Sequence, residues 1–133
     1  MNNTTLRFFM TILFLVGSVS LISACGSVFK LGDMDAVREV NELAIDCKTN
    51  EALAALDRVD RGEGLGAAIG DLQRVVILRD AGRVAEANAA MAERNERAGV
   101  DAKEAAEAEK SVAKSMEQMR AERQKRTGRR TCD

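Results

Sequence analysis

Apolar residues recur every three or four positions over most of the chain after residue 32, which is the spacing of amphipathic helices. A first helix is predicted over residues 33–47, with Asp33 as its N-cap because an Asp side chain accepts hydrogen bonds from the free amides of a first turn. The pattern breaks at KTN, and Thr49 or Asn50 can cap a second helix whose apolar face extends to Val59. These two segments predict a helical hairpin.

Three further helices are predicted after the Gly-rich turn RGEGLG at residues 61–66. The third covers about residues 65–81 and ends at Gly82, and the fourth covers about residues 83–98 and ends at Gly99. Glycine suits both ends because a helix commonly closes with one residue in the left-handed conformation. These two helices predict a second hairpin.

The fifth helix is the longest and runs from a capping box at Asp101 and Glu104 to about Lys125. Its apolar positions form a thin stripe suited to packing against a neighbour: Ala105, Ala108, Val112, Met116 and Met119. The chain lacks proline and is rich in Ala, Glu, Arg and Leu. The predicted fold class is therefore all-α: a five-helix antiparallel array of two helical hairpins plus a long C-terminal capping helix.

A shift of 35 residues aligns the second hairpin with the first and matches several apolar positions. It superimposes Val37 on Leu72, Val40 on Val75, Leu43 on Leu78, and the pair Glu51-Ala52 on Glu86-Ala87. The segment LRDAGRVAEANAAM at residues 78–91 resembles a tetratricopeptide repeat, whose period is close to this one. The resemblance implies two repeat-like hairpins with a binding groove.

The chain also departs from that family, since Arg74 stands where the repeat has an apolar residue and the closing proline is missing. An irregular helical bundle is the alternative architecture.

The N-terminus has the layout of a secretory signal. A polar start with Arg7 precedes an uncharged, mostly apolar stretch from Phe8 to Ala24. This stretch has 17 residues and is interrupted by Gly and Ser, whereas a bilayer-spanning helix needs about 20 apolar residues. A transmembrane anchor is therefore the weaker interpretation.

The end of this stretch, Ile22-Ser23-Ala24-Cys25, resembles the lipobox of bacterial lipoproteins. The resemblance implies cleavage before Cys25 and acylation of its thiol with diacylglycerol, so that a lipid attaches the protein to a membrane. An ordinary cleaved signal with an incidental cysteine is the alternative. Gly26 after the cysteine, rather than Asp, implies the periplasmic side of the outer membrane more than the inner membrane.

Three regions follow from this interpretation. Residues 1–24 are a cleaved signal peptide, residues 25–32 a lipidated tether, and residues 33–133 a single helical domain with a basic C-terminal tail. Cleavage removes one basic residue and no acidic residue, so the mature chain stays close to neutral.

Export leaves Cys47 and Cys132 as an even pair in an oxidising compartment, where a disulfide is expected. Such a bond would close a loop of 85 residues and add on the order of 4 kcal/mol by the loop-entropy estimate. In an antiparallel array the first and fifth helices end at the same side, and the tail TGRRTC at residues 127–132 can fold back to bridge the gap. Two free thiols or an intermolecular bond are the alternatives.

No catalytic or cofactor site is predicted. The chain has no His, so His-based catalysis and His-ligated metals are excluded, and its cysteines do not form a CxxC pattern. The Gly-rich residues 62–66 lack the Lys-Ser/Thr of a phosphate loop. No enzyme activity, metal, cofactor or small-molecule substrate is therefore expected.

The C-terminal tail is basic and has two interpretations: a contact with anionic lipid or an acidic partner, or a solvated helix end that complements the helix dipole. Nucleic acid is not an expected partner because the chain is predicted to be exported and because Phe29 is the sole aromatic residue after the predicted signal peptide, which leaves too few rings for base stacking. The basic residues are Arg120, Arg123, Lys125, Arg126, Arg129 and Arg130.

The predicted function is that of a lipid-anchored, non-catalytic helical adaptor that binds another envelope protein in the periplasm. The alternative is a structural envelope lipoprotein that self-associates through the stripe on its fifth helix, from Ala105 to Met119.

Overall fold

A computed structural model describes residues 31–59 and 65–132, and the predicted signal peptide, the lipobox and most of the tether lie outside these ranges. The described residues form helices and no strands, which confirms the all-α fold class. The helices are α2 (Leu31–Ile45), α3 (Thr49–Asp57), α4 (Leu65–Asp80), α5 (Val84–Ala98) and α6 (Ala102–Thr127).

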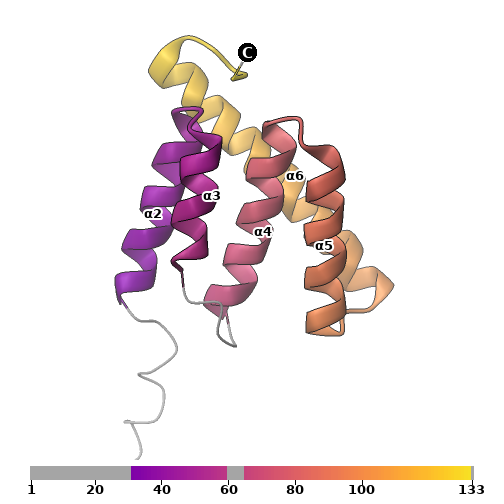
Figure 1. Cartoon of the computed structure of the whole chain (residues 1–133). Coiled ribbons are helices and arrows are strands. Elements are labelled where there is room, and N and C mark those ends of the chain that lie inside the picture. Colours follow the sequence, from indigo (N-terminus) through magenta and orange to yellow (C-terminus); the bar gives the residue numbers. More distant parts are fainter. Residues whose placement is uncertain (1–30, 60–64, 133) are drawn as a thin grey trace, which may run out of the picture.

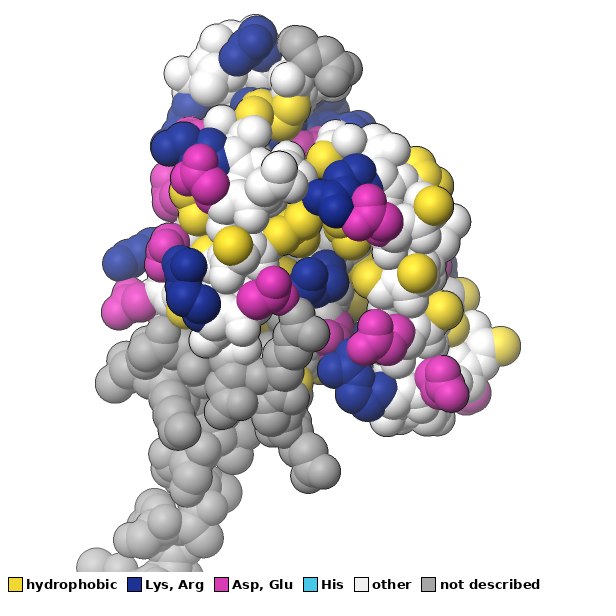
Figure 2. All heavy atoms as spheres, viewed as in Figure 1, with side chains coloured by type: hydrophobic (Ala, Val, Ile, Leu, Met, Phe, Trp, Pro, Cys, Tyr) yellow, Lys and Arg dark blue, Asp and Glu magenta, His cyan; other side chains and the backbone are white. Residues whose placement is uncertain are grey.

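The helices are arranged as two hairpins crossed by a long last helix. Figure 1 shows the chain reversing direction between α2 and α3 and again between α4 and α5, with α6 running obliquely behind them. Helix α6 packs against α4 and α2. On the face seen in Figure 2, apolar side chains lie in the seam between the hairpins, and basic and acidic side chains are interspersed around it.

The two hairpin turns have the same backbone geometry. Cys47 (φ 62°) and Gly82 (φ 71°) both adopt the left-handed conformation that closes a helix. The amide of Lys48 donates to the carbonyl of Leu43, and the amide of Arg83 makes the corresponding bond to the preceding helix, each at 2.9 Å. The two turns therefore share their hydrogen bonds at a separation of 35 residues.

Two predicted N-caps are wrong. Helix α2 begins at Leu31, so Asp33 lies in its first turn and not before it. Helix α3 begins at Thr49, and its N-cap position is held by Lys48, which makes no side-chain capping bond. The tight closure of α2 places Lys48 directly at the start of α3, so Asn50 falls inside the helix.

The capping box predicted for the last helix is confirmed. The amide of Glu104 donates to Oδ1 of Asp101 at 2.8 Å, and the amide of Asp101 donates to Oε2 of Glu104 at 3.2 Å. Helix α6 ends at Thr127, slightly beyond the expected residue, and Gly128 closes it in the left-handed conformation (φ 74°). The chain then turns back toward α2.

The core is aliphatic and includes one side of α6. Val40, Ala52, Val75 and Ala87, one from each of the other four helices, are fully buried. The predicted stripe of α6 packs into this core through Ala108, Val112 and Met119, with Met116 partly buried beside them. Burial of aliphatic surface at about 25 cal/mol per Å² is the main force that holds α6 against the hairpins. Among the described helices, none has the length and apolarity needed to cross a bilayer.

Candidate functional site

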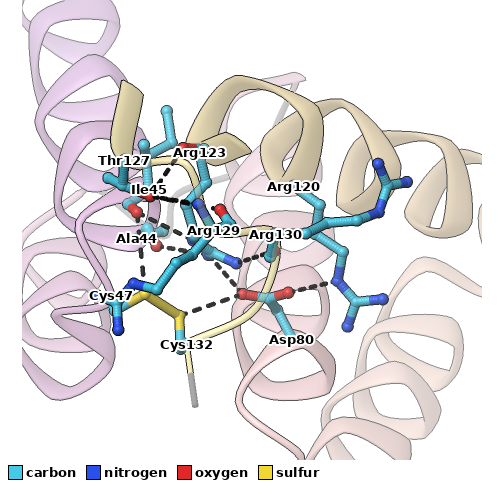
Figure 3. Close-up of a disulfide and its surroundings, with 10 residues drawn as sticks. All are labelled: Ala44, Ile45, Cys47, Asp80, Arg120, Arg123, Thr127, Arg129, Arg130 and Cys132. Atoms are coloured by element: carbon cyan, nitrogen blue, oxygen red, sulfur yellow. Dashed lines mark hydrogen bonds and ion pairs between the residues drawn. A yellow bond between two sulfur atoms is a disulfide. The ribbon is translucent and has the colours of Figure 1, made fainter. Parts of the chain in front are cut away.

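Arg123 of α6 is buried at the point where three helix ends meet the C-terminal tail (Figure 3). Its side chain is 1% exposed, and each guanidinium nitrogen has a partner. Nη2 donates to Oδ2 of Asp80 at 2.6 Å and to the carbonyl of Ala44 at 2.9 Å. Nε donates to the carbonyl of Ile45 and Nη1 to the carbonyl of Arg130, each at 3.0 Å.

Asp80 is the last residue of α4 and its side chain is 5% exposed. A carboxylate at a helix C-terminus is disfavoured by the helix dipole and by loss of hydration. Arg120 offsets this by donating from Nε to Oδ1 at 2.7 Å, while Arg123 binds the other oxygen. Two arginines of α6 thus neutralise one buried carboxylate of α4.

The structure pairs Cys47 with Cys132 beside this cluster, as predicted (Figure 3). Their Cα atoms lie 5.4 Å apart, a separation typical of a disulfide. The tail residue Cys132 also lies against Asp80, with its sulfur 3.8 Å from Oδ2. We call Arg120, Arg123, Asp80 and this disulfide the arginine junction; it fastens α6 and the tail to the ends of α2 and α4.

Neither predicted role of the basic tail, an external anionic contact or a solvated helix end, describes Arg120 and Arg123, which both bind Asp80 of the same chain. Sequence patterns did not reveal this because the acidic partner, Asp80, is 40 or more residues away from either arginine. An arginine at the end of a helix suits the dipole equally well whether it is buried or solvated.

Most of the remaining basic tail residues also pair within the chain. Arg126 donates to Glu42 at 2.7 Å and lies 3.4 Å from Asp46, and the hydrogen bond to Glu42 raises the pKa of Arg126. Arg130 pairs with Glu117, and Lys125 lies 3.3 Å from Glu122. Such exposed pairs are weak. The acidic side chains of these pairs nevertheless compete with any external anion for Arg126, Arg130 and Lys125.

A half-open groove of about 620 Å³ lies between α2, α4 and α6. Its floor is apolar and comes from Leu72 and Val76 of α4. One wall is α2, with Val37, Asn41 and Ile45 at intervals of four residues, and the other is α6, with Ser111, Ser115 and Met119 at the same interval. The groove is therefore lined lengthwise by three rows of residues, each at helical spacing.

The rim of the groove is polar. Asn41 accepts a hydrogen bond from Gln73 across the α2–α4 side. Arg38 lies on the α2 wall, and Gln118 and Glu122 lie on the α6 wall. The rim therefore places amide donors and acceptors beside the apolar floor positions.

Helix α6 is clamped to α4 at a second point away from the arginine junction. Arg79 donates to both carboxylate oxygens of Glu109, at 2.5 and 2.9 Å. This hydrogen bonding lowers the pKa of Glu109 and raises that of Arg79. The pair fixes the N-terminal half of α6 to α4.

In the part of the chain that the structure describes, no three acidic or cysteine side chains are placed to hold a metal ion. Of the predicted site residues, Cys47 and Cys132 meet at the junction, whereas Cys25 lies outside the described residues. Comparison with family models, with curated proteins and with solved structures finds no match for this chain.

Proposed function

We propose that this chain is a lipid-anchored envelope protein that acts as a non-catalytic helical adaptor. A lipid on Cys25 holds it on the periplasmic side of a membrane, and the outer membrane is favoured over the inner membrane. The groove between α2, α4 and α6 binds a segment of another envelope protein. The observation that carries this proposal is the groove itself, which combines an apolar floor, a polar rim and an open side.

The short tether supports a function close to the membrane. Helix α2 begins at Leu31, six residues after Cys25, and an extended chain of that length spans at most about 22 Å. The groove begins at Val37, six residues further along α2, or about 9 Å along the helix axis. A partner in this groove would therefore itself lie near the membrane surface.

The paired turn geometry supports a double-hairpin domain with tetratricopeptide-like character. The turns at Cys47 and Gly82 share their left-handed residue and their hydrogen bonds at a separation of 35 residues. In this interpretation α6 is the capping helix, and the groove is the part of the α2–α4 face that α6 leaves open.

Self-association through α6 is less well supported. The stripe on which it depends is used inside the chain, because Val112 is 1% exposed and Ala108 and Met119 are buried. A second copy would have to displace this packing. The adaptor interpretation needs no such rearrangement.

Site-specific photocrosslinking in intact cells tests the adaptor. A benzophenone amino acid at Ser115 lies in the groove wall, and the same group at Ala113 is the matched control on α6 outside the groove lining. We expect one discrete heterologous adduct from Ser115 and none from Ala113. Equal yields at both positions, or adducts with a second copy alone, would refute the adaptor.

The anchor is tested separately with Cys25→Ser. The wild-type chain is expected to incorporate labelled fatty acid and to fractionate with membranes, and the variant is expected to do neither. Labelling of the variant, or absence of label from the wild type, contradicts the lipid attachment.

A further inference from the structure

The two walls of the groove are joined by polar contacts at one end only. Among the described residues, the hydrogen bonds and ion pairs between α2 and α6 come from Arg123, which binds the carbonyls of Ala44 and Ile45, and from Arg126, which binds the last turn of α2. Figure 1 shows α6 running away from α2 toward the α5 side. The groove is therefore a wedge whose closed end is the arginine junction.

The C-terminal tail covers the buried arginine at that closed end. The carbonyl of Arg130 accepts from Nη1 of Arg123, and Cys132 lies against Asp80 (Figure 3). The tail is linked covalently to the α2–α3 turn only through its bond to Cys47. Its other attachments among the described residues are non-covalent: the hydrogen bond from Arg123 to the carbonyl of Arg130, the contact of Cys132 with Asp80, the exposed Arg130–Glu117 pair and hydrogen bonds around the turn. The exposed pair is weak on its own.

We propose that the Cys47–Cys132 disulfide is a redox-sensitive latch on the groove. In the oxidised chain the tail shields the Arg123–Asp80 pair and the walls stay together. In the reduced chain the tail is released, water reaches the pair, and α2 separates from α6 at the junction, so the groove loses its shape and its affinity. The consequence for binding rests on the proposed adaptor function.

The reducing partner is a dithiol. One thiolate attacks a sulfur of the disulfide and forms a mixed disulfide, and the second thiol then displaces the remaining protein sulfur. The protein gains two electrons and two protons as two thiols, and the dithiol becomes a disulfide. Both Cys47 and Cys132 are half-buried residues at the edge of the domain and do not belong to its fully buried core.

The physical link between the tail and the walls is the dielectric around Arg123. A charged hydrogen bond shielded from water is much stronger than one in solvent, since the interaction scales inversely with the effective dielectric constant. When water reaches the pair, the attraction between Arg123 and Asp80 becomes weaker. Water molecules then also compete with the carbonyls of Ala44 and Ile45 for the donors of Arg123. The rest of α6 stays on α4 through Val112 and the Arg79–Glu109 pair.

The latch predicts a local opening that can be measured without knowing the partner. Nitroxides are attached through keto amino acids at Arg38 and Gln118, on opposite walls of the groove, so that the native cysteines stay untouched. A control pair at Ala54 and Ala89, exposed on α3 and α5, reports on the two hairpins. Pulsed dipolar spectroscopy is run on the full chain before and after dithiothreitol.

We expect the distance between the walls to become longer and more broadly distributed on reduction, while the control distance is unchanged. Hydrogen exchange of the amides at residues 43–46 should become at least about tenfold faster. The variant Arg123→Met, kept oxidised, should open the walls in the same way. An unchanged wall distance overturns the latch, and so does a change in both pairs, because that means unfolding of the whole domain.

The crosslinking position in the groove separates this inference from the adaptor itself. Loss of the Ser115 adduct after reduction, with the chain still folded, supports the latch. An adduct of equal yield in both redox states overturns the latch and leaves the adaptor standing. If Ser115 gives no adduct in either state the adaptor fails, and the wall distances still decide whether the disulfide controls the groove.

Discussion

Replacement of Arg123 by methionine removes the charge at the centre of the arginine junction and keeps most of the side-chain length. The variant leaves Asp80 with Arg120 alone and removes the donors to the carbonyls of Ala44 and Ile45. Both members of the pair are at least 95% shielded from solvent, so water cannot easily replace the lost partner.

Removal of one member of a buried ion pair typically costs about 3–5 kcal/mol. The cost here should lie toward the lower end, about 3 kcal/mol, because Arg120 still binds one oxygen of Asp80. Stability of small domains is about 5–15 kcal/mol, so a loss of this size remains measurable with the chain folded.

The assay is urea unfolding followed by far-UV circular dichroism, with the disulfide intact in every sample. The matched control is Arg130→Met, which removes an exposed pair with Glu117 and should cost less than about 1 kcal/mol. A loss for Arg123→Met no larger than for Arg130→Met would refute the junction as a source of stability.

A double variant tests whether the charge or its pairing matters. Asp80→Leu combined with Arg123→Met removes both buried charges, and replacement of such a pair by apolar groups is often nearly neutral. We expect the double variant to lose less stability than the two single variants added together, by about 1 kcal/mol or more. Simple additivity would show that Arg123 and Asp80 act independently.

Three further outcomes are expected. Serine at both Cys47 and Cys132 should lower the free energy of unfolding by about 4–5 kcal/mol, measured by urea titration, because the bond closes an 85-residue loop. An unchanged free energy of unfolding would contradict the disulfide. The hydrogen bond from Arg79 lowers the pKa of Glu109 in the folded chain, so its stabilisation is present above the ordinary value of about 4.3 and disappears as pH falls through the lowered value. The gap in melting temperature between wild type and Arg79→Met should therefore be largest above about pH 4.3 and should narrow as the pH falls below that value, and a gap that does not change with pH would argue against the ionised pair. Gly82→Ala should destabilise the chain by about 1 kcal/mol in thermal unfolding, since φ is +71° although no atom blocks the added methyl group; an unchanged melting temperature would contradict this.

The helices could be predicted closely because their signals are local. The periodicity of apolar residues, the capping box at Asp101 and the glycines at positions 82 and 99 all act within a few residues of the chain. The misplaced caps at Asp33 and Asn50 are errors of the same local kind, where several polar residues compete to start a helix. The cysteine pair was expected from the interpretation of Cys25 as a lipid-attachment residue, because that interpretation leaves Cys47 and Cys132 as a single internal pairing.

By itself the sequence determined five helices, their approximate ends and the two hairpins, and it favoured the pairing of Cys47 with Cys132 over free thiols or an intermolecular bond. The tertiary structure alone decided that Arg123 is a buried partner of Asp80 and not a solvated charge, and that α2, α4 and α6 leave a groove between them. The physical reason is the range of the interactions. Helix propensity and capping act over one or two turns, whereas the burial of a charge depends on a partner more than 40 residues away, which only the crossing of α6 over the hairpins brings into contact.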